Sequence, residues 1–211
     1  MTITKLGHCC LLIKEQRLTI LTDPGVFSTE QNSVTGIDVV LITHEHQDHF
    51  HIDSLKQVLQ HNPNAVVVTN TAVGNLLDKE SIPYQILEEG QNRTFGKVEI
   101  EGFGREHAEI YPTIPRVQNT GFLIGGKLFF PGDAFTIPSK SIEVLALPVA
   151  GPWMHIREAI DYAKAVKPKK VFPVHDGFLK FGGPFYTMPK MLIEPAGIEF
   201  VAPDGQTPME F

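Results

Sequence analysis

Three histidines and two acids fall within six residues in the stretch THEHQDHF, residues 43–50, directly after an apolar run. The pattern H-x-H-x-D-H would arise by chance with odds of roughly one in a thousand in a chain of this length and composition. Imidazole and carboxylate groups without sulfur are ligands that suit Zn, Fe or Mn. A solvated polar turn after a strand is the alternative. A metal site requires further ligands elsewhere in the chain.

Candidate ligands elsewhere in the chain each follow an apolar or strand-like run. They are Asp23 after RLTILT, His107 after VEIEGFGRE, Asp133 after KLFFPG and His175 after KKVFPV, and His44 follows DVVLIT in the same way. Residues at strand ends gather at one edge of a sheet, where loops carry function on a rigid scaffold. A single edge could therefore bring these side chains together, as a polynuclear metal site requires.

One ion is expected to take three imidazoles. His44 and His46 are two residues apart, so both can face the same way from an extended segment. His107 completes this set. Asp133 is the natural bridge to a second ion, because a carboxylate has two oxygens to share.

The second ion is expected to take Asp48, His49 and His175. With the bridging carboxylate, three protein ligands per ion leave a position for water, as a catalytic site requires. Asp48 lies beside that position and is the candidate catalytic residue that orients the attacking water and shuttles its proton. The expected cofactors are two divalent metal ions, with Zn as the first choice and Mn, Fe or Ni as alternatives.

The elements that must position these residues divide into two halves, each with strands first and helices later. In the first half we expect strands over 2–15, 17–23, 37–44, 65–70 and 83–87, a helix over 54–61 with Asp53 as its N-cap, and a helix over 71–80. In the second half we expect strands over 96–103, 142–149, 169–176 and 198–203, a hairpin over 119–133 turning at Gly125-Gly126, and helices over 155–166 and 185–194, the last interrupted by Pro189. This order predicts an α/β fold of two packed sheets with helices outside.

Length and composition limit the function classes. A chain of 211 residues, of which 42% are hydrophobic and 20% charged, fits a single domain over residues 1–211. The net charge of -6 argues against a broad nucleic-acid-binding surface. No apolar run approaches a membrane span, and the N-terminus lacks the features of a signal peptide. Two adjacent cysteines, Cys9 and Cys10, are poorly placed to bridge each other, so we expect a cytoplasmic protein.

As a set, these motifs resemble those of the metallo-β-lactamase superfamily. The matching residues are Asp23 in LTDPG, His44, His46, Asp48 and His49 in THEHQDH, His107, Asp133 in FPGD and His175 in PVHD, in the family's order. The resemblance implies an αβ/βα four-layer sandwich of two mixed β-sheets flanked by helices. It also implies a binuclear metal-dependent hydrolase, in which a hydroxide shared by the two ions attacks the substrate. Asp23 would orient a ligating histidine.

Finer features of the sequence narrow the resemblance. The opening GHCCLLI resembles the G-H-x-x-x-L-I start of a branch that includes ascorbate-phosphate lactonases and N-acyl-phosphatidylethanolamine phospholipases. Asp133 stands where the true β-lactamases have a cysteine, so antibiotic hydrolysis is not expected. The short segment after His175 has no room for the added domain of glyoxalase II, and there is no inserted arm like that of the tRNA 3′-end nucleases. We therefore expect a minimal hydrolase body.

Three further residues are candidates for substrate contacts. His8 is either a structural strand histidine or a donor that faces the substrate. Trp153 and His155 follow LPVAGP, where they either form a pocket wall or pack the start of a helix. The loops Tyr111–Gln118 and Phe178–Tyr186 carry Pro or Gly and aromatic residues, so we expect them at the rim of the pocket.

The substrate class stays open at this level, because one fold and one metal site serve many chemistries. The first hypothesis is hydrolysis of a small ester, lactone or related metabolite. The second is a phosphodiesterase or small nuclease on the same metal site. A third is a binding or sensor module that holds metal without turnover. We expect a small-molecule substrate, no nucleic acid and no membrane, and we allow for a homo-oligomer.

Overall fold

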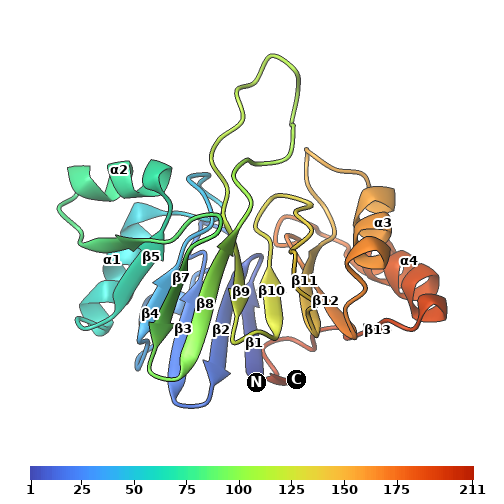
Figure 1. Cartoon of the computed structure of the whole chain (residues 1–211), viewed down its shortest axis with the longest axis horizontal. Coiled ribbons are helices and arrows are strands. Elements are labelled where there is room, and N and C mark those ends of the chain that lie inside the picture. The colour runs from blue at the N-terminus through green and yellow to red at the C-terminus, as the bar shows by residue number, and fades with distance from the viewer.

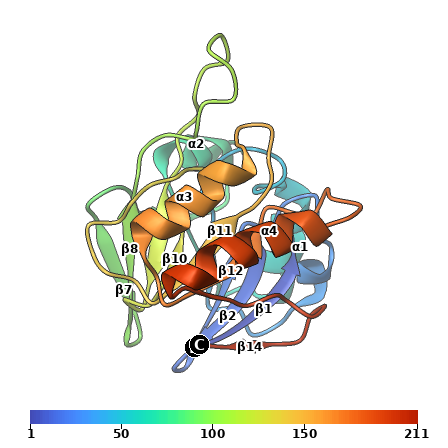
Figure 2. The ribbon, with the colours of Figure 1, turned by 90° about the vertical axis from the view of Figure 1, so that its right-hand side faces the viewer.

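Two seven-stranded β-sheets pack face to face in the computed structural model, which describes Met1–Phe211. Figure 1 shows α1 (Ile52–His61) and α2 (Thr71–Lys79) on one flank of the paired sheets and α3 (Ile156–Val166) and α4 (Gly183–Ile193) on the other, and Figure 2 shows α3 and α4 lying side by side. The predicted αβ/βα sandwich of two mixed sheets flanked by helices is confirmed. The two termini meet at one end of the molecule, where the amino group of Met1 donates to the carbonyl of Phe211.

The first sheet is built from the first half of the chain and the last strand. Its strands, in spatial order, are β14 (Met209–Glu210), β1 (Thr2–Gly7), β2 (Cys10–Glu15), β3 (Leu18–Thr22), β4 (Val39–Leu41), β5 (Val66–Thr69) and β6 (Tyr84–Ile86). Pairing is antiparallel from β14 to β3 and parallel from β3 to β6. Parallel neighbours need a crossover. A 3-10 helix (Glu30–Ser33) lies between β3 and β4, and α1 (Ile52–His61) and α2 (Thr71–Lys79) form the next two crossovers.

The second sheet repeats this plan. Its strands, in spatial order, are β13 (Glu199–Phe200), β12 (Lys170–Val174), β11 (Val144–Pro148), β10 (Leu128–Phe130), β9 (Gly121–Ile124), β8 (Val98–Phe103) and β7 (Asn92–Phe95). Pairing is antiparallel from β7 to β10 and parallel from β10 to β13. The crossovers contain α3 (Ile156–Val166) and α4 (Gly183–Ile193), the latter followed by a 3-10 helix (Glu194–Ala196). All four α-helices are too short or too polar to cross a membrane.

Alternate side chains of the central strands face two different core layers. In β4, Val39 and Leu41 point into the layer between the sheets, whereas Val40 points to the layer under α1 and α2. Both faces of this strand are buried, which explains its continuous apolar sequence. Cys9 and Cys10 also lie in these two different layers, and both are free thiols.

Several boundaries differ from the predicted ones. The segment 2–15 is a hairpin and not one strand, because the chain turns at His8, where φ is +48°. The pattern also does not reveal β7, which is mostly exposed, or β14, which has two residues. The turn at Gly125-Gly126 is confirmed, and both glycines have a positive φ, +60° and +65°, which other residues rarely adopt.

Two helices also begin or continue differently. The N-cap of α1 is His51 and not Asp53, which lies in the first turn, where a carboxylate stabilises the helix dipole. The helix α4 continues through Pro189 as one element of 11 residues. Apolar residues on both sides of the proline, Phe185 and Ile193, pack on the same core layer and hold the two parts together.

Candidate metal centre

The candidate ligands lie at the end of the sandwich opposite the chain termini, where strands of both sheets finish (Figure 1). His44 follows β4 of the first sheet. His107, Asp133 and His175 follow β8, β10 and β12 of the second sheet. The predicted gathering of strand ends at a common edge is therefore observed, and the edge belongs to both sheets at once.

A first group of ligand atoms contains three imidazoles and one carboxylate. One atom from each of His44, His46, His107 and Asp133 lies within 4.8 Å of all the others. His46 is partly exposed, and the other three side chains are buried. This is the set that the spacing predicts for one ion.

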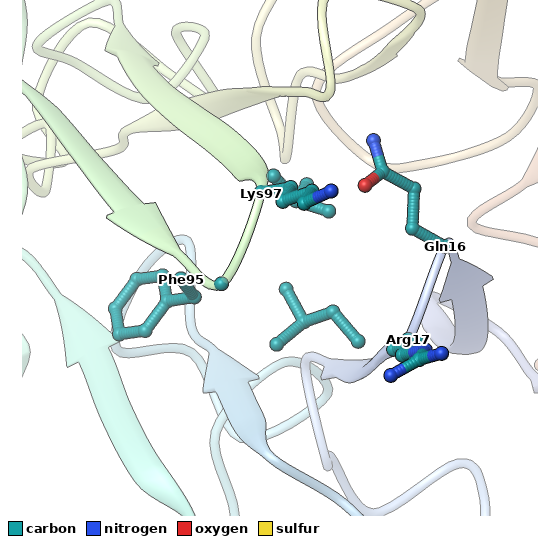
Figure 3. A pocket seen from close by; sticks show the side chains of 7 residues that line it. Gln16, Arg17, Phe95 and Lys97 are labelled. Carbon is teal, nitrogen blue, oxygen red and sulfur yellow. The ribbon is translucent and has the colours of Figure 1, made fainter.

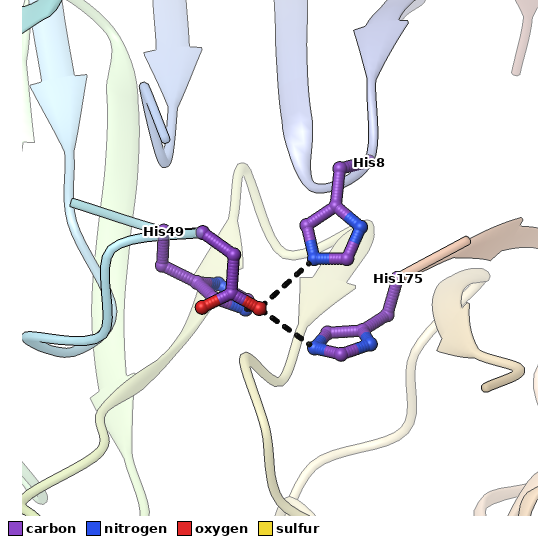
Figure 4. A group of neighbouring side chains, drawn as sticks. His8, His49 and His175 are labelled. Carbon is purple, nitrogen blue, oxygen red and sulfur yellow. Dashed lines mark hydrogen bonds and ion pairs between the residues drawn. The ribbon is translucent and has the colours of Figure 1, made fainter. Parts of the chain in front are cut away.

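A second group lies beside the first. It contains Asp48 and His49, from the turn that precedes α1, together with His175 and His8, again within 4.8 Å of one another. Figure 4 shows the rings of His8, His49 and His175 turned toward one another. Asp48 Oδ2 lies 3.5 Å from His175 Nε2 and 3.3 Å from His8 Nε2. The sequence predicts three of these four residues as ligands, and His8 is the addition.

Asp133 lies between the two groups. Its Oδ1 is 3.1 Å from His49 Nε2, and its Oδ2 is 2.8 Å from His175 Nε2. The same Oδ2 is 3.3 Å from His107 Nε2 in the first group. A carboxylate in contact with imidazoles of both groups has the position that a bridge between two ions requires.

Hydrogen bonds at Nδ1 orient the buried rings of the centre. Three rings pair with oxygens that can only accept: His49 with Asp23 Oδ2 at 2.7 Å, His107 with the Ala108 carbonyl at 2.6 Å and His175 with the Ala150 carbonyl at 2.6 Å. Each Nδ1 must therefore carry the proton, which leaves the Nε2 lone pair free in the neutral ring. This tautomer is the one that binds a metal through Nε2.

Asp23 also fixes the ring orientation and tautomer of His44, through the hydroxyl of Thr43. The Thr43 hydroxyl donates to Asp23 Oδ2 at 2.8 Å, so its oxygen accepts from Nδ1 of His44 at 3.0 Å. The Thr43 backbone N–H donates to Asp23 Oδ1 at 2.8 Å. One buried carboxylate thus fixes one histidine from each group, His44 through Thr43 and His49 directly. Thr43 carries no chemical signal of its own in the sequence.

The candidate metal-ligand atoms of the centre have no hydrogen-bond partner in the protein. Five buried atoms have none: Nε2 of His44, His49, His107 and His175, and Oδ1 of Asp133. A buried polar atom without a partner is unfavourable, and native proteins rarely keep several of them together. Their convergence, their tautomers and the two carboxylates beside them fit cations in this place.

Charges within the centre shift pKa values in opposite directions. Burial opposes ionisation of Asp133, yet the rings of His49 and His175 hold its pKa well below the usual range. Burial also disfavours a charged His175, but Asp133 and Asp48 outweigh it and raise its pKa to about 9. Burial lowers the pKa of His44, and the other rings add to this effect. The carboxylates therefore favour positive charge in the centre.

The three candidate substrate contacts lie in different places. His8 is 1% exposed and bonds to Asp48, so it is no substrate-facing donor at the rim. Trp153 is 7% exposed and packs behind the ligands, with its ring centroid 5.7 Å from those of His107 and His175. His155 is not part of the cluster. Its side chain is 90% exposed, and its backbone begins α3, held by the Glu158 carboxylate.

A pocket of about 410 Å³ opens beside the second group. Its lining comprises Asp48 and His175 together with Val26, Phe27, Gln47, Pro152 and Phe178. Of the two loops expected at the rim, the one that begins at Phe178 contributes that side chain. The other loop places Ile114 and Arg116 in a narrow recess beside His46 and His107. The loop of Val26 and Phe27 carries no motif that points to a pocket wall.

A second sizeable cavity lies away from the candidate ligands. It has about 530 Å³ and lies at the other end of the sandwich, between the turn that joins β2 to β3 and the turn that joins β7 to β8 (Figure 3). Gln16, Arg17, Phe95 and Lys97 are among its lining residues. It contains none of the candidate ligands, so it is not part of the metal centre.

Two mixed sheets with a cluster of histidines and aspartates at their common end define a metal-dependent hydrolase of the metallo-β-lactamase fold. The chain belongs to the β-lactamase superfamily, because the family model described as "Beta-lactamase superfamily domain" matches residues 2–175. The superfamily and the class of enzyme predicted from the motifs are thereby confirmed.

Individual relatives agree with this placement. Protein Rv0786c of Mycobacterium tuberculosis is 35% identical over 85% of each chain. A UPF0173 metal-dependent hydrolase of Carboxydothermus hydrogenoformans is 25% identical over 83% of this chain and 84% of its own. A crystal structure of a candidate metal-dependent hydrolase from Parabacteroides distasonis superposes with a TM-score of 0.78, at 24% identity, over 97% of this chain and 93% of its own. These names do not specify the lactonase or phospholipase branch, which stays a prediction.

Proposed function

We propose that this protein is a binuclear metal-dependent hydrolase of small neutral esters or lactones. One observation supports the metal centre most strongly. Buried histidine Nε2 atoms and a carboxylate oxygen converge without hydrogen-bond partners, and the rings have the tautomer that binds a cation. One ion is assigned to His44, His46 and His107, the other to Asp48, His49 and His175, and both to Asp133. When bound, two such ions supply Lewis acidity and lower the pKa of water toward neutrality.

Asp48 is the residue assigned to the nucleophilic water. It is 24% exposed and lines the 410 Å³ pocket, whereas Asp133 is 2% exposed. Burial opposes its ionisation, but the neighbouring His175 and His8 rings hold the pKa of Asp48 below its usual range. The carboxylate is therefore ionised and accepts a hydrogen bond from water on the pocket side, which orients the water toward the substrate.

The pocket walls support a substrate with a neutral, apolar part. Val26, Phe27 and Phe178 are each partly exposed there, at 39%, 45% and 44%. Exposed apolar side chains that border a site gain free energy when an apolar group covers them, at about 25 cal/mol per Å². An acyl chain or a lactone ring beside the scissile carbonyl would have this effect.

A phosphodiester is the alternative substrate, and the pocket favours it less. No lysine or arginine lines the pocket. Lys5 is bound to Asp176 and to the Pro173 carbonyl, and Arg116 pairs with two glutamates. A bound phosphate anion would therefore have the metal ions but no side-chain cation as a partner.

A panel of chromogenic substrates tests the proposal. Zinc-reconstituted protein is assayed with 4-nitrophenyl acetate, butyrate and octanoate, with the anionic 4-nitrophenyl hemisuccinate, and with bis(4-nitrophenyl) phosphate. We expect kcat/KM to rise with acyl length and to be lowest for the two anions, and chelator-treated protein to be inactive. Faster turnover of the phosphodiester than of every ester would instead support the phosphodiesterase.

A further inference from the structure

His8 lies where distance alone would make it a metal ligand. Its Nε2 is 3.3 Å from Asp48 Oδ2, and its ring belongs to the second group with His49 and His175. The side chain is buried, and the backbone of His8 has a φ of +48°. Residues other than glycine stay in this region only where their surroundings fix them. The fold therefore imposes the position of this ring.

The backbone N–H of Gly177 determines where the ring of His8 carries its proton. This N–H group lies 3.0 Å from Nδ1 and can only donate, so Nδ1 accepts and is unprotonated. An imidazole ring carries at least one N–H, so with Nδ1 unprotonated the proton of His8 is on Nε2, which faces Asp48 Oδ2 at 3.3 Å. A flipped ring would place carbon atoms against both partners, so the orientation of the ring is determined as well.

We infer that His8 is a positioning residue that donates its Nε2–H to Asp48 and is not a ligand of either ion. A protonated Nε2 has no lone pair for a cation. Three of the proposed ligand rings, such as His49, have the opposite tautomer, with Nδ1 as the donor. The inference rests on the proposed function, because it assigns Asp48 to the metal centre.

The contacts of His8 show what it positions. It stands in the turn between β1 and β2, its carbonyl accepts from the His175 N–H at 3.3 Å, and its ring is 4.3 Å from the His175 ring. Its Nε2 meets the same Asp48 oxygen that lies 3.7 Å from His49 and 3.5 Å from His175. Asp48 is partly exposed, so this hydrogen bond restricts the carboxylate to the rotamer that faces the second group.

The tautomer of His8 is measurable in the wild-type protein. We expect long-range heteronuclear NMR of metal-free and zinc-loaded protein to show an unprotonated Nδ1 and a protonated Nε2 at His8 in both. In the zinc-loaded protein, His49 and His175 should show coordination through Nε2. Zinc coordination at His8, or a protonated Nδ1 in either sample, would overturn the inference. Absence of zinc binding would refute the proposed function, and the metal-free spectrum would still decide the tautomer.

Two amide substitutions separate the two hydrogen bonds of His8. In His8→Asn, the amide oxygen can replace Nδ1 toward Gly177, but no group reaches Asp48. In His8→Gln, the amide nitrogen can replace Nε2 and donate to Asp48. We expect His8→Asn to weaken binding of the second zinc ion and to lower kcat by about 10- to 100-fold, as loss of a group that orients a ligand does. His8→Gln should recover most of this loss.

Zinc titration and kcat distinguish this inference from two others. If His8 only holds the loop of Gly177, His8→Asn keeps that bond and should behave like the wild type, which would contradict positioning. If His8 is a ligand, both variants should bind one zinc ion fewer per chain at saturating zinc, and glutamine should give no recovery. The inference is supported if both variants bind two zinc ions per chain and differ from each other in zinc affinity and kcat.

Discussion

The hydrogen bond at Nδ1 determines whether a histidine in this centre can bind metal through Nε2. At His49, Nδ1–H donates a hydrogen bond to the Asp23 carboxylate, which leaves the Nε2 lone pair free. At His8, a backbone N–H occupies Nδ1 and leaves Nε2 as a hydrogen-bond donor. Two residues of the same type, with ring centroids 5.5 Å apart, therefore have different chemistry. The partner of the remote nitrogen, and not proximity to the centre, decides which ring can bind metal.

At the same scale, Phe178 is expected to select substrates. Phe178→Ala removes an exposed wall of the pocket, so stability should change by less than about 1 kcal/mol. For 4-nitrophenyl octanoate we expect kcat/KM to fall by roughly tenfold, since about 1–2 kcal/mol of apolar contact is lost. The acetate has no chain to cover the wall and should lose much less.

Phe181→Ala is the matched control for this substitution. Phe181 belongs to the same loop and is 76% exposed, but it does not line the pocket. Its removal should leave the ratio of octanoate to acetate turnover unchanged. Equal effects of the two substitutions on this ratio would show that the Phe178 wall does not contact the acyl chain.

At the scale of elements, the sequence predicts best which candidate ligands lie at the ends of strands. Asp133 and His175 each follow a run of buried apolar residues, and such runs identify strands whose ends share an edge. The order of strands and helices also predicts the sandwich. The two-residue spacing of His44 and His46 places them in one group, as observed.

Contacts made by the backbone were beyond the reach of sequence reasoning. The carbonyls of Ala108 and Ala150 orient two rings, and any residue could supply them. The inward position of His8 depends on a left-handed turn that the GHCC stretch does not reveal. His155 looks like a site residue in the sequence, but the start of α3 turns its side chain to solvent. These features depend on loop conformation, for which side-chain patterns carry little signal.

The turn after β10 provides a prediction at the scale of an element. Gly132 has a φ of +65°, and a Cβ there would lie 2.3 Å from Asn119 Oδ1 and 2.9 Å from Thr43 Cβ. Asn119 Oδ1 accepts from the Asp133 N–H, so a side chain at position 132 must displace the groups that hold Asp133. We expect Gly132→Ala to lower zinc affinity by at least about tenfold, as measured by competition with a chelating dye.

Gly126→Ala is the control that separates the steric clash at position 132 from the backbone strain of a positive φ. Gly126 has the same φ of +65°, but a Cβ there would meet nothing within 4 Å. Both substitutions should lower the free energy of unfolding by the left-handed penalty of about 1–2 kcal/mol. Only Gly132→Ala should change zinc affinity. If Gly126→Ala weakens zinc binding equally, the turn does not position Asp133 through packing.

At the scale of the whole molecule, the centre joins the two sheets. His44 comes from the first sheet, and Asp133 and His175 come from the second, so ions bound between them would crosslink both halves. Ligands that bind only the folded state stabilise it by mass action. The apolar layer between the sheets, which includes Cys9 and Val174, lies next to the metal centre. Zinc should therefore raise Tm for the complete domain and not for one half.

Zinc binding is also expected to release protons. Burial lowers the pKa of His175, but Asp133 and Asp48 outweigh burial and raise it from 6.5 to about 9. In metal-free protein, this stabilisation is complete below pH 6.5 and is lost as pH rises through about 9. Zinc affinity should change in the opposite direction, rising with pH until His175 is neutral. Calorimetry near neutral pH in buffers of different ionisation enthalpy measures the protons, and buffer-independent heats would contradict this prediction.

We propose that Asp133 holds two metal ions between the two groups of ligands. A crystal of zinc-reconstituted protein, measured at the zinc absorption edge, tests it most directly. We predict two anomalous peaks in each chain, one beside His44, His46 and His107 and one beside Asp48, His49 and His175, with an oxygen of Asp133 in contact with each. A single peak, or two peaks of which only one contacts Asp133, would contradict the binuclear centre.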